Sequence, residues 1–276
     1  MSRVVIHPGD ESGPPLPSAL ASLKEIEQRI RGRRTVLFLD YDGTLTPIVD
    51  DPDKALLPES MRSALIDLTA RCTVAVISGR DLKDVRGKVA LDGMVYAGSH
   101  GFDIDGPEGM HIRSQRGEEF LPLLDTAEER LREQLVSVSG VLVERKKFSV
   151  AVHYRKVKED QVKSVEKAVD EVIDNQPRLR RSSGKKVFEI QPGIDWHKGK
   201  ALLWLMEKMG LAGGDVTSFY IGDDTTDEDA FRALPEGGIG IVVMDRPRPT
   251  AAHYMLKDPG EVETFIRNLS EMLKGE

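Results

Sequence analysis

Two acidic clusters in this chain each follow an apolar run, at positions where carboxylates can do chemistry. In the first, TVLFLDYDGTLTPI at 35–48, Asp40 and Asp42 lie at the end of the run. One carboxylate can attack phosphorus to give an aspartyl phosphate, and the other can protonate the leaving oxygen and then take a proton from water. Gly43 permits a sharp turn close to a ligand. An isolated DG pair is more typical of a solvated turn, so this interpretation depends on the rest of the chain.

The second acidic cluster is YIGDDTTDEDAF at 220–231, which contains Asp223, Asp224 and Asp227. Carboxylates packed this densely repel one another. A hard divalent cation would relieve the repulsion, and oxygen ligands favour magnesium. A helix N-terminus with Thr226 as its cap accounts for the residues after 226, but not for the Asp223–Asp224 pair directly at a strand end.

A hydroxyl group and a cation complete the set. Ser78, in AVISGRD at 75–81, could hold a phosphate oxygen together with backbone amides at the start of a helix. Lys198 opens another helical pattern, where the helix macrodipole disfavours a positive charge. A capping serine and a solvent-exposed lysine explain each residue on its own. Together with the acidic clusters, they supply the nucleophile, acid/base, metal ligands, hydroxyl and cation that phosphoryl transfer requires.

The elements that would position these residues alternate between strands and helices. Apolar strand-like runs occur at 35–40, 73–77, 94–97, 217–221, 239–243 and 254–256. Helical patterns occur at 18–31, 58–70, 80–89, 198–210, 226–233 and 260–273. This alternation predicts an α/β fold with a parallel sheet, and the continuously apolar strands indicate that helices cover both of its faces. We therefore expect the four clusters to meet beyond the carboxyl ends of the strands, at one edge of the sheet.

The middle of the chain, residues 108–191, interrupts the alternation. It contains helical patterns at 117–137 and 158–174. Strand candidates occur at 141–144, 147–154, 178–182 and 186–190. We expect an inserted α+β domain here, with junctions near the Gly-Pro turn at 106–107 and the Pro-Gly turn at 192–193. The predicted core is then formed by residues 1–107, with an N-terminal extension at 1–33, and by residues 192–276.

The order of the motifs resembles a known group of enzymes. DYDGT, the strand end at Ser78, Lys198 and GDDTTDED are similar to the four motifs of the haloacid dehalogenase-like phosphatases, from about residue 34 to 258. The strings LFLDYDGTLTPI, ISGR, AGSHG, HYR and GDDTTDEDAF resemble the trehalose-6-phosphate phosphatases more closely still. That family has a Rossmann-like core and an α/β cap inserted between the second and third motifs, as the inserted block predicts here. The resemblance implies hydrolysis of trehalose 6-phosphate to trehalose and inorganic phosphate.

The resemblance also implies roles for the acidic residues. Asp40 would be the nucleophile and Asp42 the acid/base. Magnesium would be held by Asp40, the Asp42 carbonyl and Asp223, with Asp227 in support. Ser78 and Lys198 would be catalytic residues that contact the phosphoryl group. The remaining candidates would bind the substrate, and in the core these are Thr44, Arg80 and His100. In the inserted block they are Glu144, Lys146, His153, Arg155, Lys185 and Glu189.

The pattern in the inserted block has a simpler explanation as well. Glu144, Lys146 and Glu189 suit sugar hydroxyls, since carboxylates and an ammonium can pair with them in a fixed arrangement. Ordinary strand-surface charge, alternating with buried apolar residues at 148, 150 and 152, produces the same pattern. Gln191 departs from the family, which has an arginine there, and this weakens the assignment of the sugar.

Composition excludes several other classes of protein. The net charge of -7 argues against non-specific nucleic-acid binding, and no apolar run approaches the roughly 18 residues of a membrane span. The single cysteine, Cys72, rules out an internal disulfide framework, and the N-terminus has no signal-peptide pattern. We expect a soluble, cytoplasmic monomer. A functional link to a trehalose-phosphate synthase follows only from the resemblance.

Two alternatives stay open at this point. The core motifs contact only phosphate, so they would serve sucrose phosphate or a glycosylglycerate phosphate equally well. The chain could also be a non-catalytic phosphosugar-binding module. The second alternative is disfavoured because the residues that carry the chemistry are intact: Asp40, Asp42, Lys198, Asp223 and Asp227.

Overall fold

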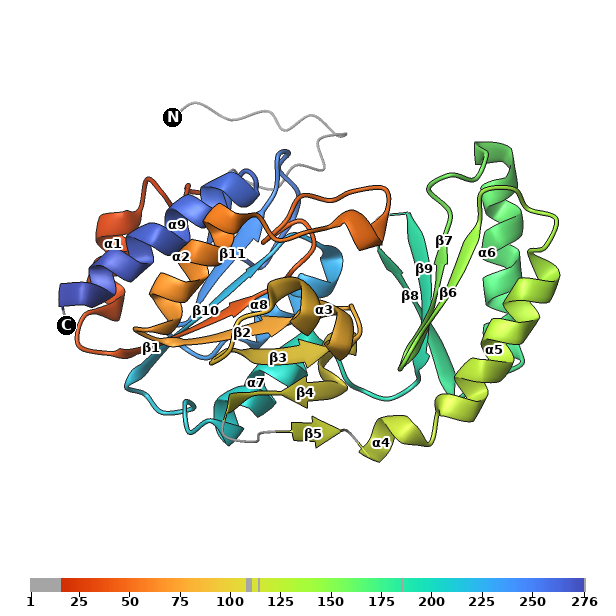
Figure 1. The fold of residues 1–276 in the computed structure, drawn as a ribbon, viewed down its shortest axis with the longest axis horizontal. Coiled ribbons are helices and arrows are strands. Elements are labelled where there is room, and N and C mark those ends of the chain that lie inside the picture. The colour runs from red at the N-terminus through yellow and green to blue at the C-terminus, as the bar shows by residue number, and fades with distance from the viewer. Residues whose placement is uncertain (1–15, 108–110, 114, 185, 276) are drawn as a thin grey trace, which may run out of the picture.

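The computed structural model describes residues 16–107, 111–113, 115–184 and 186–275. Its larger sheet contains β1 (Arg34–Leu39), β2 (Thr73–Ile77), β3 (Val95–Gly98), β4 (Asp103–Asp105), β5 (His111–Arg113), β10 (Val216–Gly222), β11 (Ile239–Val243) and β12 (Tyr254–Leu256). The strand order is β12-β11-β10-β1-β2-β3-β4-β5, parallel from β12 to β3 and antiparallel from β3 to β5 (Figure 1). An α/β fold with a mostly parallel sheet is therefore confirmed.

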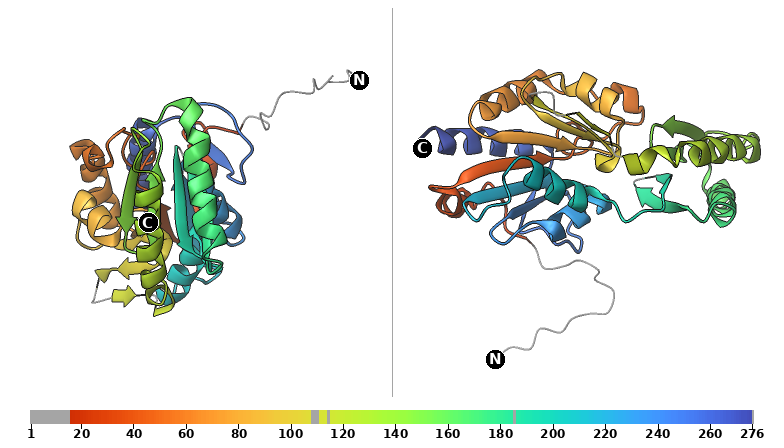
Figure 2. Two further views of the ribbon diagram at one scale, coloured as in Figure 1. Left: turned by 90° about the vertical axis from the view of Figure 1, so that its right-hand side faces the viewer. Right: turned by 90° about the horizontal axis from the view of Figure 1, so that it is seen from below.

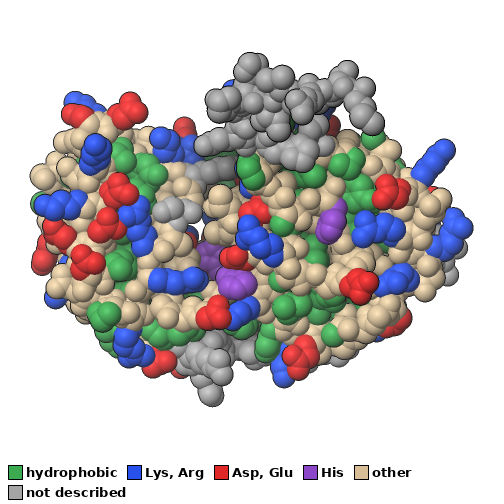
Figure 3. Space-filling model, turned by 180° about the vertical axis from the view of Figure 1, so that it is seen from behind, with side chains coloured by type: hydrophobic (Ala, Val, Ile, Leu, Met, Phe, Trp, Pro, Cys, Tyr) green, Lys and Arg blue, Asp and Glu red, His purple; other side chains and the backbone are tan. Residues whose placement is uncertain are grey.

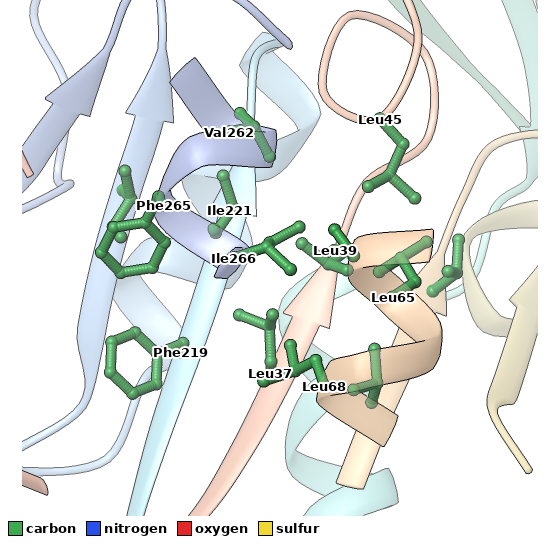
Figure 4. Close-up of a cluster of buried hydrophobic side chains, with 14 of the residues drawn as sticks. Leu37, Leu39, Leu45, Leu65, Leu68, Phe219, Ile221, Val262, Phe265 and Ile266 are labelled. Atoms are coloured by element: carbon green, nitrogen blue, oxygen red, sulfur yellow. The ribbon is translucent and has the colours of Figure 1, made fainter. Parts of the chain in front are cut away.

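Helices cover both faces of this sheet because the strands are apolar on both sides. On β1, Leu37 and Leu39 face one core cluster while Val36 and Phe38 face the other. The first cluster packs against α1 (Leu23–Ile30), α2 (Glu59–Thr69), α3 (Leu82–Val89) and α9 (Pro259–Met272), and Figure 4 shows α2 and α9 side chains meeting the strands. The second packs against α7 (Lys198–Lys208) and α8 (Glu228–Ala233). We call this sheet with its helices the core.

The second unit, residues 121–192, has its own sheet and its own apolar cluster. It contains α5 (Leu121–Gln134), β6 (Leu142–Lys146), β7 (Ser149–His153), α6 (Glu159–Asp174), β8 (Leu179–Gly184) and β9 (Val187–Pro192). The antiparallel order is β6-β7-β9-β8, and both helices pack on one face of the sheet (Figures 1 and 2). We call this unit the cap. The short helix α4 (Gln115–Glu118) precedes it.

The hairpin between β6 and β7 docks its tip on the core. The Lys147 backbone amide donates to both carboxylate oxygens of Asp81, at 2.9 and 3.0 Å. The Lys147 ammonium pairs with Asp103, and the Phe148 ring stacks on Phe102 with centroids 5.5 Å apart. The cap therefore contacts the core through this hairpin tip (residues 146–148) as well as through its two chain connections.

Several element boundaries differ from the sequence-based prediction. The helix expected at 117–137 is divided between α4 and α5, because Pro122, in the first turn of α5, has no N–H with which to continue the hydrogen bonds of α4. Helices α1 and α3 begin at Leu23 and Leu82, later than the expected 18 and 80. Strands β4 and β5, of three residues each, were not predicted.

The surface gives no sign of a single dominant charge on the face shown in Figure 3, where basic and acidic side chains are interspersed. Within the described part of the chain, no helix combines the length and the apolar character needed to cross a membrane.

Candidate active site

Asp40 follows β1 directly, at the centre of the parallel sheet. Its backbone amide still donates to the Ile221 carbonyl of β10 at 2.9 Å, so the strand pairing continues to this residue and fixes its direction. The side chain is buried, and Lys198 donates to it at 2.8 Å. Burial raises the pKa of the Asp40 carboxyl well above its usual value; the Lys198 charge opposes this rise, while Asp227 adds to it.

Asp227 lies behind Asp40 and accepts hydrogen bonds from several groups of the site. Its Oδ1 accepts from the Lys198 ammonium at 2.7 Å and from the Tyr220 hydroxyl at 2.6 Å. Its Oδ2 accepts from the backbone amides of Asp223 and Asp224 at 3.0 and 2.9 Å. Because both oxygens are occupied and the residue is fully buried, Asp227 fixes the positions of the groups around it.

Lys198 lies between two carboxylates at the first position of α7. Burial alone would lower the pKa of its ammonium, but Asp227 and Asp40 more than offset this and raise the pKa well above its usual value. The ion pairs also compensate for placing a cation at a helix N-terminus.

Three carboxylates meet at this edge of the sheet. Among the described residues, Asp40, Asp223 and Asp227 each bring one oxygen within 4.8 Å of the others, the spacing of a metal-ligand cluster. Gly43 makes the arrangement possible: it has a φ of +81°, and a Cβ at this position would lie 2.2 Å from Asp223 Oδ2. A larger residue would therefore displace the Asp223 carboxylate.

Arg80, in the loop after β2, binds the side chain of Asp42. Its guanidinium donates to both Asp42 oxygens, at 2.6 and 2.7 Å, and to Asp84 at 2.7 Å. It also donates to the Pro52 carbonyl at 2.9 Å and lies 5.4 Å from the centre of the Tyr41 ring. This bidentate pair fixes the orientation of the Asp42 carboxylate and brings a cation to the wall of the site.

Ser78 follows β2, the strand that pairs with β1. Its Oγ accepts from the Arg80 backbone amide at 3.1 Å. The amides that follow it belong to a loop, since α3 begins only at Leu82 with Asp81 as its cap, so the expected placement at a helix start was wrong. Thr44 is fully buried, and its Oγ1 has no hydrogen-bond partner within the described structure.

The cap contributes a buried carboxylate, Glu189 of β9. Lys146 and Ser149 donate to its Oε1 at 3.3 and 2.7 Å, and Gln191 donates to Oε2 at 2.8 Å. The core residue His100 places its Nε2 3.2 Å from the same Oε2. Burial alone would raise the pKa of Glu189, but Lys146 and His100 lower it well below its usual value.

Two further pairs of charged or polar side chains involve cap residues on the side that faces the core. His153 Nε2 lies 2.8 Å from Glu144 Oε2, and this hydrogen bond lowers the pKa of Glu144. Arg155 forms an ion pair at 3.6 Å with Asp50, in the core loop that follows β1. These contacts place cap side chains opposite the strand ends of the core.

A cavity of about 520 Å³ lies between the cap and the strand ends. It brings together most of the residues expected from the sequence: Asp40, Asp42, Ser78, Arg80, His100, Glu144, Lys146, His153, Arg155, Glu189, Lys198 and Asp223. Thr44 and Asp227 do not line it, because both are buried behind its wall. Lys185 lies outside the described residues.

Sequence reasoning missed several residues of the site. Asp84 and Tyr220 were not singled out, although they bind Arg80 and Asp227. Asp84 lies four positions after Arg80, a spacing that favours contact on one helical turn and could have indicated the pair. Thr226 was considered as a helix cap, but it lies inside a short 3-10 helix, Thr225–Asp227, which is capped by Asp224 in a capping box with Asp227, and α8 follows from Glu228.

Comparison with known proteins agrees with this geometry. The family model described as trehalose-phosphatase matches residues 38–260. Probable trehalose-phosphate phosphatase 4 of Oryza sativa subsp. japonica is 45% identical over 260 residues, covering 92% of this chain and 71% of that protein. Trehalose-phosphate phosphatase of Mycobacterium bovis (strain BCG / Pasteur 1173P2) is 41% identical over 278 residues, covering 99% and 71%.

Solved structures show the same fold. The C-terminal domain of a C. albicans trehalose-6-phosphate phosphatase has a TM-score of 0.82 at 21% identity and covers 93% of this chain and 99% of that one. An Aspergillus fumigatus trehalose-6-phosphate phosphatase has a TM-score of 0.64 at 26% identity, covering 96% and 100%. The family match over most of the chain and the close relatives give one conclusion: this chain belongs to the trehalose-phosphatase family.

Proposed function

We propose that this chain hydrolyses trehalose 6-phosphate to trehalose and inorganic phosphate, through an aspartyl phosphate on Asp40. One observation carries the proposal: Asp40 is a buried carboxylate, held by Lys198 at 2.8 Å, that faces a cavity enclosed by core and cap. At about 520 Å³ this cavity is in the range that small-molecule ligands fill. The family of the chain and its relatives support trehalose 6-phosphate as the substrate.

We assign magnesium as the cofactor, because the donor set fits a hard divalent cation. The three clustered carboxylates supply only oxygen, and their mutual repulsion is relieved by a cation. Asp227 already accepts four hydrogen bonds, so the ligand oxygens would come from Asp40, Asp223 and the Asp42 carbonyl. Magnesium bound there would neutralise charge on the phosphoryl oxygens.

The chemistry divides between two carboxyl groups. Asp40 attacks phosphorus as the bond to the sugar oxygen breaks, and Asp42 gives that oxygen its proton. Water then attacks the phosphorus of the aspartyl phosphate and Asp42 takes its proton, which releases phosphate and regenerates Asp40. The bidentate pair with Arg80 holds the Asp42 carboxyl group beside the cavity.

The other core residues hold the reacting groups in place. Lys198 orients the Asp40 carboxylate through its 2.8 Å contact and balances the negative charge around it. Ser78 lines the same cavity, where its hydroxyl can donate to a phosphoryl oxygen. Because these contacts exist before a substrate binds, little reorganisation is required during the reaction.

The cap would recognise the sugar and exclude water. We propose that residues 108–191 act as an inserted domain that closes over the strand ends. Glu144 and His153 line the cavity wall and can exchange hydrogen bonds with sugar hydroxyls. The buried Glu189 orients Lys146, which lines the same wall.

Phosphate release from a panel of sugar phosphates tests this function. We expect trehalose 6-phosphate to be hydrolysed with a higher kcat/KM than sucrose phosphate, a glycosylglycerate phosphate or glucose 6-phosphate. Chelation should stop the reaction and magnesium should restore it. A better rate with another sugar would overturn the substrate while leaving the phosphatase class. Binding without any phosphate release would favour a non-catalytic phosphosugar-binding module. The monomeric state, the cytoplasmic location and the link to a synthase stay predictions.

A further inference from the structure

The loop that carries Asp223 is held from two sides. The backbone amides of Asp223 and Asp224 donate to Asp227 Oδ2 at 3.0 and 2.9 Å. The backbone carbonyls of the same two residues accept from one nitrogen of Arg248, at 3.3 and 3.4 Å. The two residues have no regular secondary structure, so these contacts with Asp227 and Arg248 restrain their backbone.

Arg248 is itself anchored by Glu228. Its other terminal nitrogen donates to Glu228 Oε1 at 2.7 Å, and the second Glu228 oxygen accepts from the Ala251 backbone amide at 2.8 Å. The Glu228 side chain is only 9% exposed and belongs to the first turn of α8. Arg248 therefore ties the loop after β11 to α8 and, through the two carbonyls, to the loop after β10.

The Asp223 carboxylate requires such a restraint. It stands in one cluster with the carboxylates of Asp40 and Asp227, so like charges push it outward. Gly43 on the other side leaves it a tight fit, as a Cβ there would lie 2.2 Å from Asp223 Oδ2. A fixed backbone keeps the carboxylate in the cluster without help from a cation.

We propose that Arg248 is a positioning residue for the metal-binding loop, and that it raises the affinity for the divalent cation by fixing the backbone of Asp223 and Asp224. The inference rests on the proposed metal site. Arg248 acts through the loop backbone, because its guanidinium donates to the carbonyls of Asp223 and Asp224.

Electrostatics and positioning predict opposite results when Arg248 is replaced. Arg248 and Glu228 form a pair of opposite charges, so together they add little net charge near the cluster. Replacing Arg248 by Gln leaves the nearly buried Glu228 unpaired, and an added negative charge by itself would attract a cation. Weaker cation binding in this variant is therefore expected only if the backbone restraint matters more than the charge.

Calorimetric titration of the full chain with Mg²⁺, without substrate, measures this directly. We expect Arg248→Gln to bind Mg²⁺ about tenfold more weakly than the wild type. Arg246→Gln is the matched control: it makes the same charge change in the same loop, and Arg246 is exposed with no partner in the described structure. Its Mg²⁺ affinity should equal that of the wild type. Equal or tighter binding by Arg248→Gln would overturn the proposal.

A second variant and a kinetic measurement separate positioning from general stability. Arg248→Lys keeps the charge but lacks the planar fork that reaches Glu228 and two carbonyls together, so we expect affinity about threefold below the wild type. If Arg248→Gln does not fold, Arg248→Lys alone tests the proposal, and an Mg²⁺ affinity equal to that of the wild type would then refute it.

With trehalose 6-phosphate, activity lost by either variant at limiting Mg²⁺ should recover in excess Mg²⁺. A loss that excess Mg²⁺ does not reverse indicates a structural role instead. Sugar-phosphate hydrolysis by the wild type is measured separately, so failure of the proposed function is distinguishable from failure of this inference.

Discussion

The core and the cap hold their charged side chains differently. In the core, Asp40, Lys198 and Asp227 are almost without exposed surface, and each bonds another member of the group. In the cap, the Glu144 side chain is 41% exposed, and its ion-pair partner among the described residues is His153 on the neighbouring strand. The groups that we propose act on the phosphate are thus fixed in advance, whereas a group that we propose binds the sugar keeps an oxygen available for it. We therefore expect substitutions in the core to change the reaction at phosphate, and substitutions such as those of Glu144 in the cap to change the choice of sugar.

Glu189 shows that this division does not follow the boundary between the two units. It belongs to the cap by sequence, yet it is nearly as buried as the core carboxylates and has four partners. One of these partners, His100, comes from the core. Glu189 should therefore behave as a fixed structural group, unlike Glu144.

The largest effect is expected from Asp40→Asn. The amide cannot attack phosphorus, so kcat should fall by roughly 10³-fold or more, about 4 kcal/mol in activation free energy. Because the loss concerns the phosphate, trehalose 6-phosphate and p-nitrophenyl phosphate should be affected equally. Lys198 keeps its bond to Asp227, so circular dichroism should show a native fold. A folded variant that retains a tenth of the wild-type activity would contradict the role of Asp40.

Glu144→Ala should separate the two substrates. Trehalose 6-phosphate should lose roughly ten- to a thousand-fold in kcat/KM, about 1.4–4 kcal/mol, because hydroxyls that pair with Glu144 are left without a partner. Hydrolysis of p-nitrophenyl phosphate should change by less than about threefold. Glu159→Ala, at an exposed position of α6, is the control and should resemble the wild type. Parallel loss on both substrates would show that Glu144 supports closure rather than recognition.

Glu189→Gln should mainly change stability. Burial by itself would raise the pKa of Glu189, but Lys146 and His100 lower it well below 4.5, so the ionised form is favoured in the folded protein. Ionised Glu189 then stabilises the folded state fully above about pH 5, and this contribution is lost as the pH falls through the lowered pKa. At pH 7 we expect the free energy of unfolding of the variant to be about 1.5–3 kcal/mol lower than that of the wild type.

Urea unfolding of wild type and Glu189→Gln at several pH values measures this contribution. The difference between the two proteins should shrink as the pH is lowered from about 5, because protonation removes the same charge that the substitution removes. A difference that is constant from pH 7 to pH 4 would mean that charge does not account for the role of Glu189.

The smallest effect is expected at the edge of the cavity. The ion pair between Asp50 and Arg155 spans 3.6 Å, and the Asp50 side chain is 77% exposed. Solvent screens such a pair, so Asp50→Asn should change the free energy of unfolding by less than about 0.5 kcal/mol. Thermal unfolding at low and high salt checks this. A shift as large as that of Glu189→Gln would mean that exposed contacts hold the cap as strongly as buried ones.

The sequence predicted the parallel strands well because each is a continuous apolar run bounded by polar residues. It missed β4 and β5, which are short and polar, with sequences DID and HIR. Their pairing depends on the neighbouring strand β3 and leaves no periodic pattern of their own. The break between α4 and α5 was marked by Pro122, but the apolar spacing across it was read as one helix.

The candidate site was predictable as far as its motifs extend. Asp40, Asp42 and Lys198 follow strand ends or open a helix, so topology alone brings them to one edge of the sheet. Asp227 was expected to support the metal, but the four hydrogen bonds that fill its oxygens depend on side-chain packing. Arg248 lies in an irregular loop with no motif, and only the three-dimensional structure shows its contacts.

The docked hairpin tip attaches the cap to the core at a further point, besides the two chain connections. Two chain connections alone would allow the cap to swing and twist, but the tip, held by Asp81 and stacked against Phe102, removes part of that freedom. From the tip, β6 and β7 extend four residue steps to the Leu142–His153 pair, roughly 14 Å at about 3.4 Å per residue. A small rotation about the tip therefore produces its widest displacement near Leu142 and His153. Both residues line the cavity, and Arg155, two positions after His153, forms the exposed ion pair with Asp50. Widening the cavity in this way would break that ion pair and the contact between His100 and Glu189, while the tip keeps its hydrogen bonds to Asp81.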